Sequence, residues 1–472
     1  MIEHSKIFIN GEWVDSAGTG TLTVINPATE ETFATIPSGT AKDVDLAANA
    51  AADAFLAWSQ STIADRVDII TRAARLLRAR TEEITRTIVC EVGHPWAWAE
   101  AFHARGAVED LDVVIESLPK ITWSEPIDND VNVVREPAGV VGAITPWNAP
   151  LAAICTKAGA AIGAGCAVIL KGSEVAPLTS FMFAEAFAEA GLPPGVLNVV
   201  CGTGPEVGEA IVAHPAVDMI SLTGSVRAGQ RIMEVASRSV KRVVLELGGK
   251  SANLVLDDAD LELAVTEGIH EAFRNAGQSC GALSRILVPA KSLARVEEIA
   301  AAVAGSYVPG DPFDPATTLG PLANGAQFQR VQGYIHAGVD DGLRVITGGL
   351  GRPDGLDRGF FVQPTIFSSD NTSRTAREEI FGPVLTIITY RDEEDAIAIA
   401  NDSPFGLAGA VWSSDVERAR RVARRIRVGR VLINGHPMGR RAPHGGCKLS
   451  GFGRERGRFG VEEFTQYKSI IG

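Results

Sequence analysis

Between residues 138 and 256 the sequence alternates short apolar runs with longer segments in which apolar side chains recur every three or four positions. The first pattern is typical of buried strands and the second of amphipathic helices, so together they predict a parallel, doubly wound sheet. One helix is expected to end at Gly191, ahead of Leu-Pro-Pro. The expected strands are Gly139–Thr145, Ala167–Leu170, Val196–Val200, Met219–Leu222 and Arg242–Leu245.

Two further regions extend this pattern. A second alternation of strands and helices runs from about residue 252 to 434 and predicts a second α/β domain. Residues 119–136 differ, because Ile121 and Trp123, and then Val131 and Val133, alternate with polar neighbours on either side of an Asp-Asn-Asp turn. Alternation with a period of two around a turn predicts a long hairpin.

The composition fits two or three packed domains, since 46% of the 472 residues are apolar. A net charge of −13 opposes a general affinity for nucleic acid or anionic membranes. The one strongly basic run, Arg418–Arg430, carries apolar residues at helical spacing. This spacing favours a solvated helix face over a nucleic-acid site.

The chain has no stretch of about 18 to 20 consecutive apolar residues, the length that a membrane span needs, and its first residues lack a signal pattern. We therefore expect a cytoplasmic protein. The six cysteines lack the paired spacing of a disulfide framework or a zinc site, which fits a reducing compartment. The eight histidines form no ligand motif, so no metal is expected.

Two fragments bring a carboxylate and a thiol into small-residue settings: Glu246-Leu-Gly-Gly-Lys250 and Gly277-Gln-Ser-Cys280. Such a pair suits covalent catalysis, in which a thiolate attacks a carbonyl carbon and a carboxylate later activates water. Taken alone, each fragment has a simpler interpretation. A cysteine is more often an inert small hydrophobe, and Gly-Gly after a strand is more often a turn.

Five more motifs accompany this pair along the chain. They are Pro146-Trp-Asn148, Lys171-Gly-Ser-Glu174, Leu222-Thr-Gly-Ser225, Glu379-Ile-Phe-Gly-Pro383 and Ser403-Pro-Phe-Gly-Leu407. In this order and at these separations the seven motifs resemble the aldehyde dehydrogenase superfamily, and the match runs from Asn10-Gly11 to Lys468-Ser-Ile470.

The resemblance implies an α/β fold in three parts. A doubly wound cofactor-binding domain is expected over residues 1–118 and 137–247, and an α/β catalytic domain over residues 248–446. Residues 119–136 and 447–472 would form a small β bridging element, with which family members add strands to a partner's sheet. Because an exposed strand edge left unpaired invites aggregation, a homodimer or homotetramer is expected.

The resemblance also assigns the chemistry. Cys280 is the expected nucleophile and forms a thioester, and Glu246 is the expected base for the water that hydrolyses it. Relatives that pass the acyl group to coenzyme A lack this carboxylate, so its presence favours release of a free acid. A thiol of pKa near 8.5 still needs a lowered pKa or a nearby base to become a thiolate.

Asn148 follows a strand of the predicted sheet, at the edge where ligands bind in such folds. Its amide and the backbone N–H of Cys280 are the expected donors to the developing oxyanion. The alternative is an asparagine that caps the helix beginning near Ala149-Pro150.

The cofactor is expected to be NAD, bound away from the only glycine-rich segment that resembles a dinucleotide fingerprint. Gly202-Thr-Gly204-Pro-Glu-Val-Gly208 departs from G-x-G-x-x-G in its last interval and lacks the acidic residue that should follow. The resemblance places the pyrophosphate near Thr223-Gly-Ser225 and the helix start after it, where backbone N–H groups suit phosphate. Gly224 and Gly229 would permit close approach, and Trp147 and Leu247 are expected beside the cofactor.

Four side chains are expected to hold the two riboses and the nicotinamide ring. Lys171 and Glu174 would reach the adenine ribose, where the carboxylate of Glu174 accepts hydrogen bonds from hydroxyls but repels a 2′-phosphate, so NAD is favoured over NADP. Lys171 is counted with the catalytic residues as well. Glu379 and Phe381 would grip the nicotinamide ribose and flank the ring. Their simpler interpretation is a loop charge and a core aromatic.

Small residues stand where many relatives have bulky ones: Ala149, Ala153 and Thr156 follow the Pro-Trp-Asn motif. We therefore expect a wide substrate tunnel, also lined by Ser279 and Gly281 beside the nucleophile. His444 occupies a position that is often aromatic in the family. It could hydrogen-bond a polar substrate, or serve simply as a flat ring, which we favour.

The substrate is expected to be a bulky apolar or aromatic aldehyde. Arg440 and Arg441 could instead bind the carboxylate of a small semialdehyde, although an ion pair between subunits is an equal explanation for them. Two rival functions are a thiol esterase that transfers no hydride and an inactive structural relative. The intact cofactor residues oppose the first, and the intact Cys280 and Glu246 oppose the second.

Overall fold

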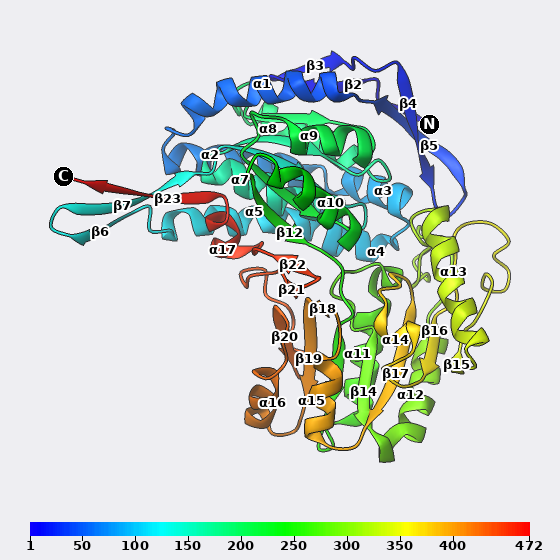
Figure 1. Ribbon diagram of the computed structural model, residues 1–472. Helices are drawn as coiled ribbons and strands as arrows, with labels where there is room; N and C mark the ends of the chain where they lie inside the picture. Colours follow the sequence, from blue (N-terminus) through cyan, green and yellow to red (C-terminus); the bar gives the residue numbers. More distant parts are fainter.

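The computed structural model describes all 472 residues and contains two large sheets, one in each of its two main parts (Figure 1). The first sheet has eight strands in the order β22-β12-β11-β8-β9-β10-β2-β3. Its five parallel central strands agree with the expected ones to within two residues at each end. They are β12 (Arg242–Glu246), β11 (Met219–Thr223), β8 (Val140–Ile144), β9 (Ala167–Lys171) and β10 (Leu197–Val200).

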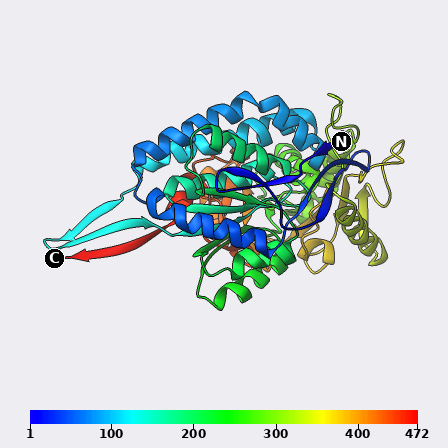
Figure 2. The same cartoon turned by 90° about the horizontal axis from the view of Figure 1, so that it is seen from above.

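Helices cover both faces of this sheet, which is why its central strands β8, β9 and β10 are buried along their whole length (Figure 2). Helix α8 ends at Glu189, close to the predicted helix end at Gly191. Gly191 has a φ of +84°, a left-handed conformation that terminates a helix. On one side lie α1 (Ala41–Trp58), α9 (Glu209–Ala213) and α10 (Val226–Ser237); α2 (Ile63–Ala79), α5 (Gly106–Ser117) and α8 (Leu178–Glu189) pack together on the other. The predicted doubly wound α/β architecture is confirmed.

The short edge strands of this sheet come from distant parts of the chain. Strands β2 (Lys6–Ile9) and β3 (Glu12–Asp15) add one antiparallel edge, and β22 (Gly451–Phe452) pairs antiparallel with β12 at the other. The N-terminal residues also form a small sheet of β1 (Ile2–Glu3), β4 (Gly20–Asn26) and β5 (Glu31–Ser38). No helix anywhere in the chain combines the length and the apolarity that crossing a membrane requires.

The second sheet has seven strands and one buried apolar cluster on each face. Helices α11 (Leu261–Phe273) and α12 (Leu293–Gly305) cover one face, and α15 (Glu393–Asn401) and α16 (Val416–Ala423) the other. The strands in spatial order are β15 (Arg344–Thr347), β16 (Thr365–Ser368), β17 (Val384–Tyr390), β14 (Arg285–Pro289), β13 (Ala252–Val255), β19 (Ala408–Trp412) and β20 (Arg430–Ile433).

A three-stranded arm projects from the body of the protein (Figures 1 and 2). The expected hairpin consists of β6 (Ser124–Asp128) and β7 (Val131–Pro137), and β23 (Thr465–Ile471) pairs antiparallel with β7. The first strand begins later than predicted. Ile121 is buried after a single helical turn at Leu118–Lys120, because its side chain belongs to the core rather than to the arm.

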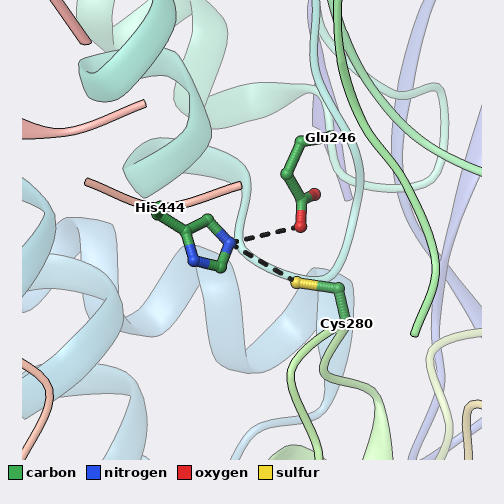
Figure 3. A group of neighbouring side chains, drawn as sticks. All are labelled: Glu246, Cys280 and His444. Atoms are coloured by element: carbon green, nitrogen blue, oxygen red, sulfur yellow. Dashed lines mark hydrogen bonds and ion pairs between the residues drawn. The ribbon is translucent and has the colours of Figure 1, made fainter. Parts of the chain in front are cut away.

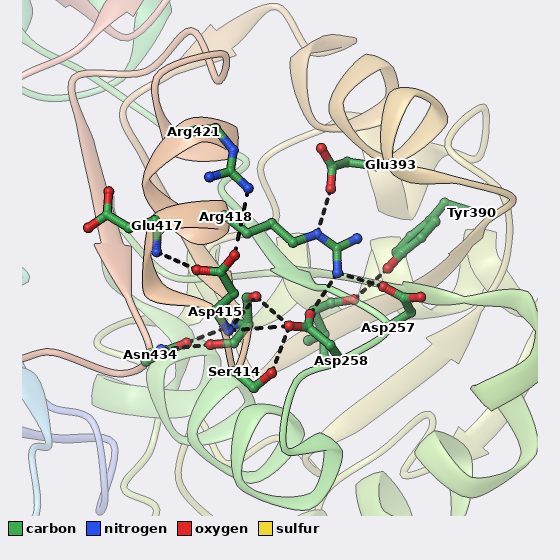
Figure 4. A network of polar contacts seen from close by, with 12 residues as sticks. Asp257, Asp258, Tyr390, Glu393, Ser414, Asp415, Glu417, Arg418, Arg421 and Asn434 are labelled. Carbon is green, nitrogen blue, oxygen red and sulfur yellow. Dashed lines mark hydrogen bonds and ion pairs between the residues drawn. The ribbon is translucent and has the colours of Figure 1, made fainter.

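The basic run Arg418–Arg430 is not one helix. Helix α16 ends at Ala423 and Arg430 already begins strand β20, so the expectation of a single solvated face was wrong beyond residue 423. Within the helix, Arg418 is 26% exposed and bonds to Asp257, Asp258 and Glu393 at 2.8 to 2.9 Å (Figure 4). Its positive charge is therefore compensated inside this domain.

Candidate active site

Five of the seven motifs line one cavity between the two main parts of the chain. Strand β8 leads into Pro146-Trp147-Asn148 and β12 ends at Glu246, while Cys280 arrives from the loop before β14. These segments share a cavity of about 290 Å³. Its lining is Pro146, Trp147, Asn148, Thr223, Gly224, Ser225, Glu246, Gly248, Cys280, Gln327, Arg330, Glu379 and Phe381.

The loop that carries Cys280 has an unusual backbone. Asn275, Ala276 and Gly277 have consecutive φ values of +58°, +50° and +71°, a left-handed conformation that side chains other than glycine adopt at a cost. The buried Gln278 fixes this turn, because its side chain donates to the Asn275 carbonyl (3.2 Å) and accepts from the Ala323 N–H (2.9 Å). The turn holds the half-buried Cys280 against the cavity.

Glu246, Cys280 and His444 form a compact group (Figure 3). The His444 Nε2 lies 3.2 Å from Glu246 Oε1 and 4.0 Å from Cys280 Sγ. The ligand-type atoms of the three side chains all lie within 4.8 Å of one another. This is close enough for a proton to pass between thiol and carboxylate with little movement.

The pKa values of the two groups are shifted in opposite directions. Burial, and then the negative charge of Glu246, raises the pKa of Cys280 well above its ordinary value. Burial also raises the pKa of Glu246, but the hydrogen bond from His444, helped by Cys280 and Lys157, outweighs it and leaves that pKa below its ordinary value. At neutral pH the pair is therefore a thiol beside a carboxylate, and the carboxylate is the nearby base.

Asn148 lies next to the nucleophile with its backbone fixed. His94 Nε2 and Asn275 Nδ2 both donate to its carbonyl oxygen, at 3.1 and 3.2 Å. Its own amide donates to the Gln278 carbonyl at 2.9 Å. The N–H of Cys280 has no acceptor within the protein. An unpaired N–H and an adjustable amide on either side of the sulfur are what an oxyanion site requires.

The predicted cofactor residues lie around the same cavity and the neighbouring strand ends. Ser225 is the N-cap of the 12-residue helix α10, and its hydroxyl accepts from the Ala228 N–H at 3.2 Å. A Cβ at Gly229 would lie 2.7 Å from Leu247 Cδ1, so this glycine lets α10 pack closely on the end of β12. Leu247 is itself buried beneath the helix and does not line the cavity, and its contact with cofactor stays a prediction.

Two further pairs of predicted cofactor residues lie close together. Lys171 Nζ and Glu174 Oε2 form an ion pair of 3.0 Å at the end of β9, next to β8. Trp147 and Phe381 meet edge to face with ring centroids 5.5 Å apart.

Glu379 accepts from the Gly249 N–H at 2.9 Å, and burial raises the pKa of Glu379 to about 7. A side chain at Gly248 would collide with that carboxylate.

A second, larger cavity of about 630 Å³ meets the first at Asn148 and at Ser279, the neighbour of Cys280. Ala149 and Ser279 line it as expected, but Ala152 lines it where Ala153 and Thr156 were expected. The reason is helical phase, because Thr156 turns inward and its hydroxyl bonds to the Ala152 carbonyl at 3.0 Å. Gly281 also lies outside the lining.

His444 and the two arginines before it have roles that the sequence did not predict. His444 contacts the catalytic pair rather than acting only as a flat ring. Arg440 pairs with Glu109 (2.9 Å) and Asp110 (3.1 Å), and Arg441 pairs with Glu116 at 2.8 Å. All these partners lie on α5 of the same chain. Ion pairs within one chain therefore account for the two arginines without a substrate carboxylate or a second subunit.

Sequence reasoning missed Arg430, Arg456 and Trp98, which line the larger cavity. Arg430 stood in the basic run that was assigned to a helix face. The one available signal was the shift from helical spacing to the apolar Val431-Leu432-Ile433, which marks a buried strand beginning at that arginine.

Comparison with known proteins agrees with the motifs. The sequence profile of the aldehyde dehydrogenase family matches residues 13–470. The chain belongs to the aldehyde dehydrogenase family. The resemblance inferred from the motifs is thereby confirmed, and with it the oxidation of an aldehyde as the activity of this enzyme.

Several relatives are similar over their whole length. A 3-succinoylsemialdehyde-pyridine dehydrogenase from Pseudomonas sp. is 47% identical over 474 residues, covering 100% of this aldehyde dehydrogenase and 99% of the relative. A solved mutant of aldehyde dehydrogenase C from Pseudomonas syringae, in complex with NAD+ and octanal, has a TM-score of 0.98 at 46% identity, covering 99% and 96% of the two chains. The Mycobacterium tuberculosis aldehyde dehydrogenase complexed with NAD+ has a TM-score of 0.97 at 42% identity, covering 100% and 98%.

Proposed function

We propose that this enzyme oxidises a bulky aldehyde to the free carboxylic acid with NAD, through a thioester on Cys280 that Glu246-activated water hydrolyses. The observation that carries the proposal is the position of one thiol and one carboxylate within 4.8 Å of each other, where a cavity of about 290 Å³ meets one of about 630 Å³. One cavity suits a cofactor and the other a substrate, and the reacting sulfur lies between them.

The smaller cavity fits a nicotinamide dinucleotide. The start of α10 offers N–H groups for the pyrophosphate, and Trp147 and Phe381 offer flat surfaces for a ring. Glu379 and Glu174 would accept hydrogen bonds from ribose hydroxyls, and the carboxylate of Glu174 favours NAD over NADP. NAD, when bound, supplies the hydride acceptor. Two of the structural relatives were solved with NAD+, which supports this assignment.

In the first stage Cys280 acts as the nucleophile. Its proton passes to the Glu246 carboxylate as the sulfur adds to the aldehyde carbon, which gives a thiohemiacetal oxyanion. The Asn148 amide, turned from the Gln278 carbonyl, and the Cys280 N–H hold that oxyanion. Loss of hydride from the same carbon leaves the acyl group bound to sulfur as a thioester.

In the second stage Glu246 acts as a general base. After releasing the first proton to solvent, its carboxylate accepts a proton from water as the water oxygen attacks the thioester carbon. The C–S bond breaks, the acid departs and Cys280 takes up a proton again. The balance is aldehyde, NAD+ and water in, and acid, reduced cofactor and two protons out, one of which the acid loses on ionising.

The rates at which the enzyme oxidises a panel of aldehydes test this proposal. Purified enzyme with NAD and octanal, benzaldehyde, acetaldehyde and succinic semialdehyde should reduce NAD fastest with the bulky apolar aldehydes. Ester cleavage indifferent to NAD, with no reduction of NAD by any aldehyde, would establish the esterase instead. If neither NAD reduction nor ester cleavage is detected, the protein is an inactive relative.

A second substrate class has its own observation. Arg430 and Arg456 line the larger cavity, and neither forms an ion pair with a carboxylate; both guanidinium groups contact Met438 Sδ. Two uncompensated cations suit an aldehyde that carries an acidic group, and a similar protein is named a semialdehyde dehydrogenase. Replacing Arg430 by Met should then lower kcat/KM for succinic semialdehyde relative to octanal by roughly 10-fold.

The exposed arm favours a homodimer or homotetramer. Strands β6 and β23 form its two edges, and nearly all their residues are exposed. Such edges pair readily with strands of another copy. Light scattering should therefore give a mass of two or four chains, and deletion of Tyr467–Gly472 should shift that mass toward one chain.

A further inference from the structure

His444 is held firmly beside the catalytic pair. Its backbone N–H and carbonyl exchange hydrogen bonds with Glu455 at 2.8 and 2.7 Å. The Glu455 side chain in turn pairs with the buried Lys157. The imidazole is only 12% exposed, so its two nitrogens meet protein groups rather than bulk water.

The partners of the two nitrogens decide where the proton lies. Arg430 Nη1 is 3.3 Å from His444 Nδ1, and a guanidinium can only donate. Nδ1 must therefore accept, which leaves the proton of a neutral imidazole on Nε2. That N–H lies 3.2 Å from Glu246 Oε1, nearer than to the Cys280 Sγ at 4.0 Å, so the carboxylate is its acceptor.

We propose that His444 is a positioning residue that donates its Nε2–H to Glu246, holding the carboxylate ionised beside Cys280 so that hydrolysis of the thioester continues below neutral pH. One hydrogen bond leaves the other lone pairs of the carboxylate free to take a proton from thiol or water. This assignment rests on the proposed function, because it gives Glu246 the task of deacylation.

The charged groups around Glu246 support this assignment. Without a donor, burial alone would raise the pKa of Glu246, and the hydrogen bond from His444 is the largest contribution that lowers it. The other ionisable groups acting on it are Cys280 from the nucleophile loop, Lys157 from the helix after Pro150, and Glu379 from the loop after α14 (Arg374–Arg377). Arg430 acts from β20. Lys157 already pairs with Glu455, and Glu379 carries the wrong sign, so neither can replace the imidazole.

The main alternative is a cysteine–histidine pair, with His444 as the base that takes the thiol proton. Three variants separate the two roles. His444→Phe keeps a flat ring and removes the donor. His444→Gln restores an N–H donor that cannot act as a base, and His336→Phe changes an exposed histidine as a control.

Two assays follow deacylation over a pH range. One measures kcat for the best aldehyde together with the initial burst of reduced cofactor. The other follows hydrolysis of p-nitrophenyl acetate, which acylates a thiol without cofactor. The second assay remains informative if no aldehyde is oxidised, so failure of the proposed function and failure of this inference give different results.

His444→Phe should shift the acid limb of both profiles upward by about one pH unit, which lowers deacylation about 10-fold at low pH and produces a burst. His444→Gln should restore most of the loss, and His336→Phe should match the wild type. An unshifted limb in the Phe variant would overturn the proposal. So would a Gln variant as impaired as the Phe variant, since that outcome requires a base at residue 444. If the Phe variant does not fold, His444→Met provides the same comparison with Gln.

Discussion

The two cavities that meet at Cys280 are built in different ways. The smaller cavity, which we assign to the cofactor, is formed mainly by residues at the ends of neighbouring strands, within a few residues of the strand that positions them. The aldehyde side draws on α5, α11, β19, β20 and the segment around Met438, which are far apart in sequence. Local motifs can therefore specify cofactor binding, whereas substrate choice depends on how distant segments pack.

The largest effect is expected from removing the Cys280 sulfur, which lies between the two cavities. Cys280→Ala should lower aldehyde oxidation by roughly 10⁴-fold or more, because no other group can carry the acyl intermediate. NAD binding, measured by fluorescence quenching, should persist, since the cofactor side remains intact. Cys447→Ala, which removes the other half-buried thiol, should behave like the wild type. Unchanged oxidation in the Cys280 variant would contradict the whole mechanism.

Asn148 belongs to both cavities but is expected to act only in the transition state. Asn148→Ala should reduce kcat by about 10²- to 10³-fold through loss of one oxyanion donor. The Michaelis constant for NAD should change little, and Asn132→Ala, on the exposed arm, provides the matched control. A large loss of NAD affinity instead would place Asn148 with the cofactor residues.

On the cofactor side, Glu174 should set the choice between NAD and NADP. Glu174→Gln removes the charge that repels a 2′-phosphate and frees Lys171 from its ion pair. The ratio of kcat/KM for NADP to that for NAD should rise roughly 10-fold, as expected for one hydrogen bond to a charged group. Relative rates across the aldehyde panel should stay constant, and Glu189→Gln should alter neither quantity. A change in aldehyde preference would show that the two sides are coupled.

The smallest expected effect is a pH dependence of cofactor binding. Burial raises the pKa of Glu379 to about 7, so the carboxylate that should accept from a ribose hydroxyl is lost as the pH falls through that value. The Michaelis constant for NAD should rise about 2- to 5-fold between about pH 8 and about pH 6. In Glu379→Gln it should be nearly independent of pH, whereas Glu378→Gln should retain the wild-type dependence. A flat wild-type profile would argue against the ribose contact.

Several features could be predicted from the sequence because their causes are local. The five parallel strands followed from continuous apolar runs, and the stop at Gly191 from a position that only glycine occupies at low cost. Cys280, Glu246 and Asn148 were identified from motifs that a single loop or strand end contains. Errors arose where a pattern crossed an element boundary, as at Arg430, or where helical phase decided the lining, as at Ala153 and Thr156.

The sequence by itself determined the α/β class and the family, and it predicted which thiol and which carboxylate react. Only the tertiary structure decided that His444, 164 residues from Cys280, lies 3.2 Å from Glu246, and that Arg430 lies 3.3 Å from the other nitrogen of its ring. Local preferences act over one turn of helix or a few strand positions. The neighbours of a side chain at the junction of two domains depend instead on how both sheets pack, and no short stretch of sequence contains that information.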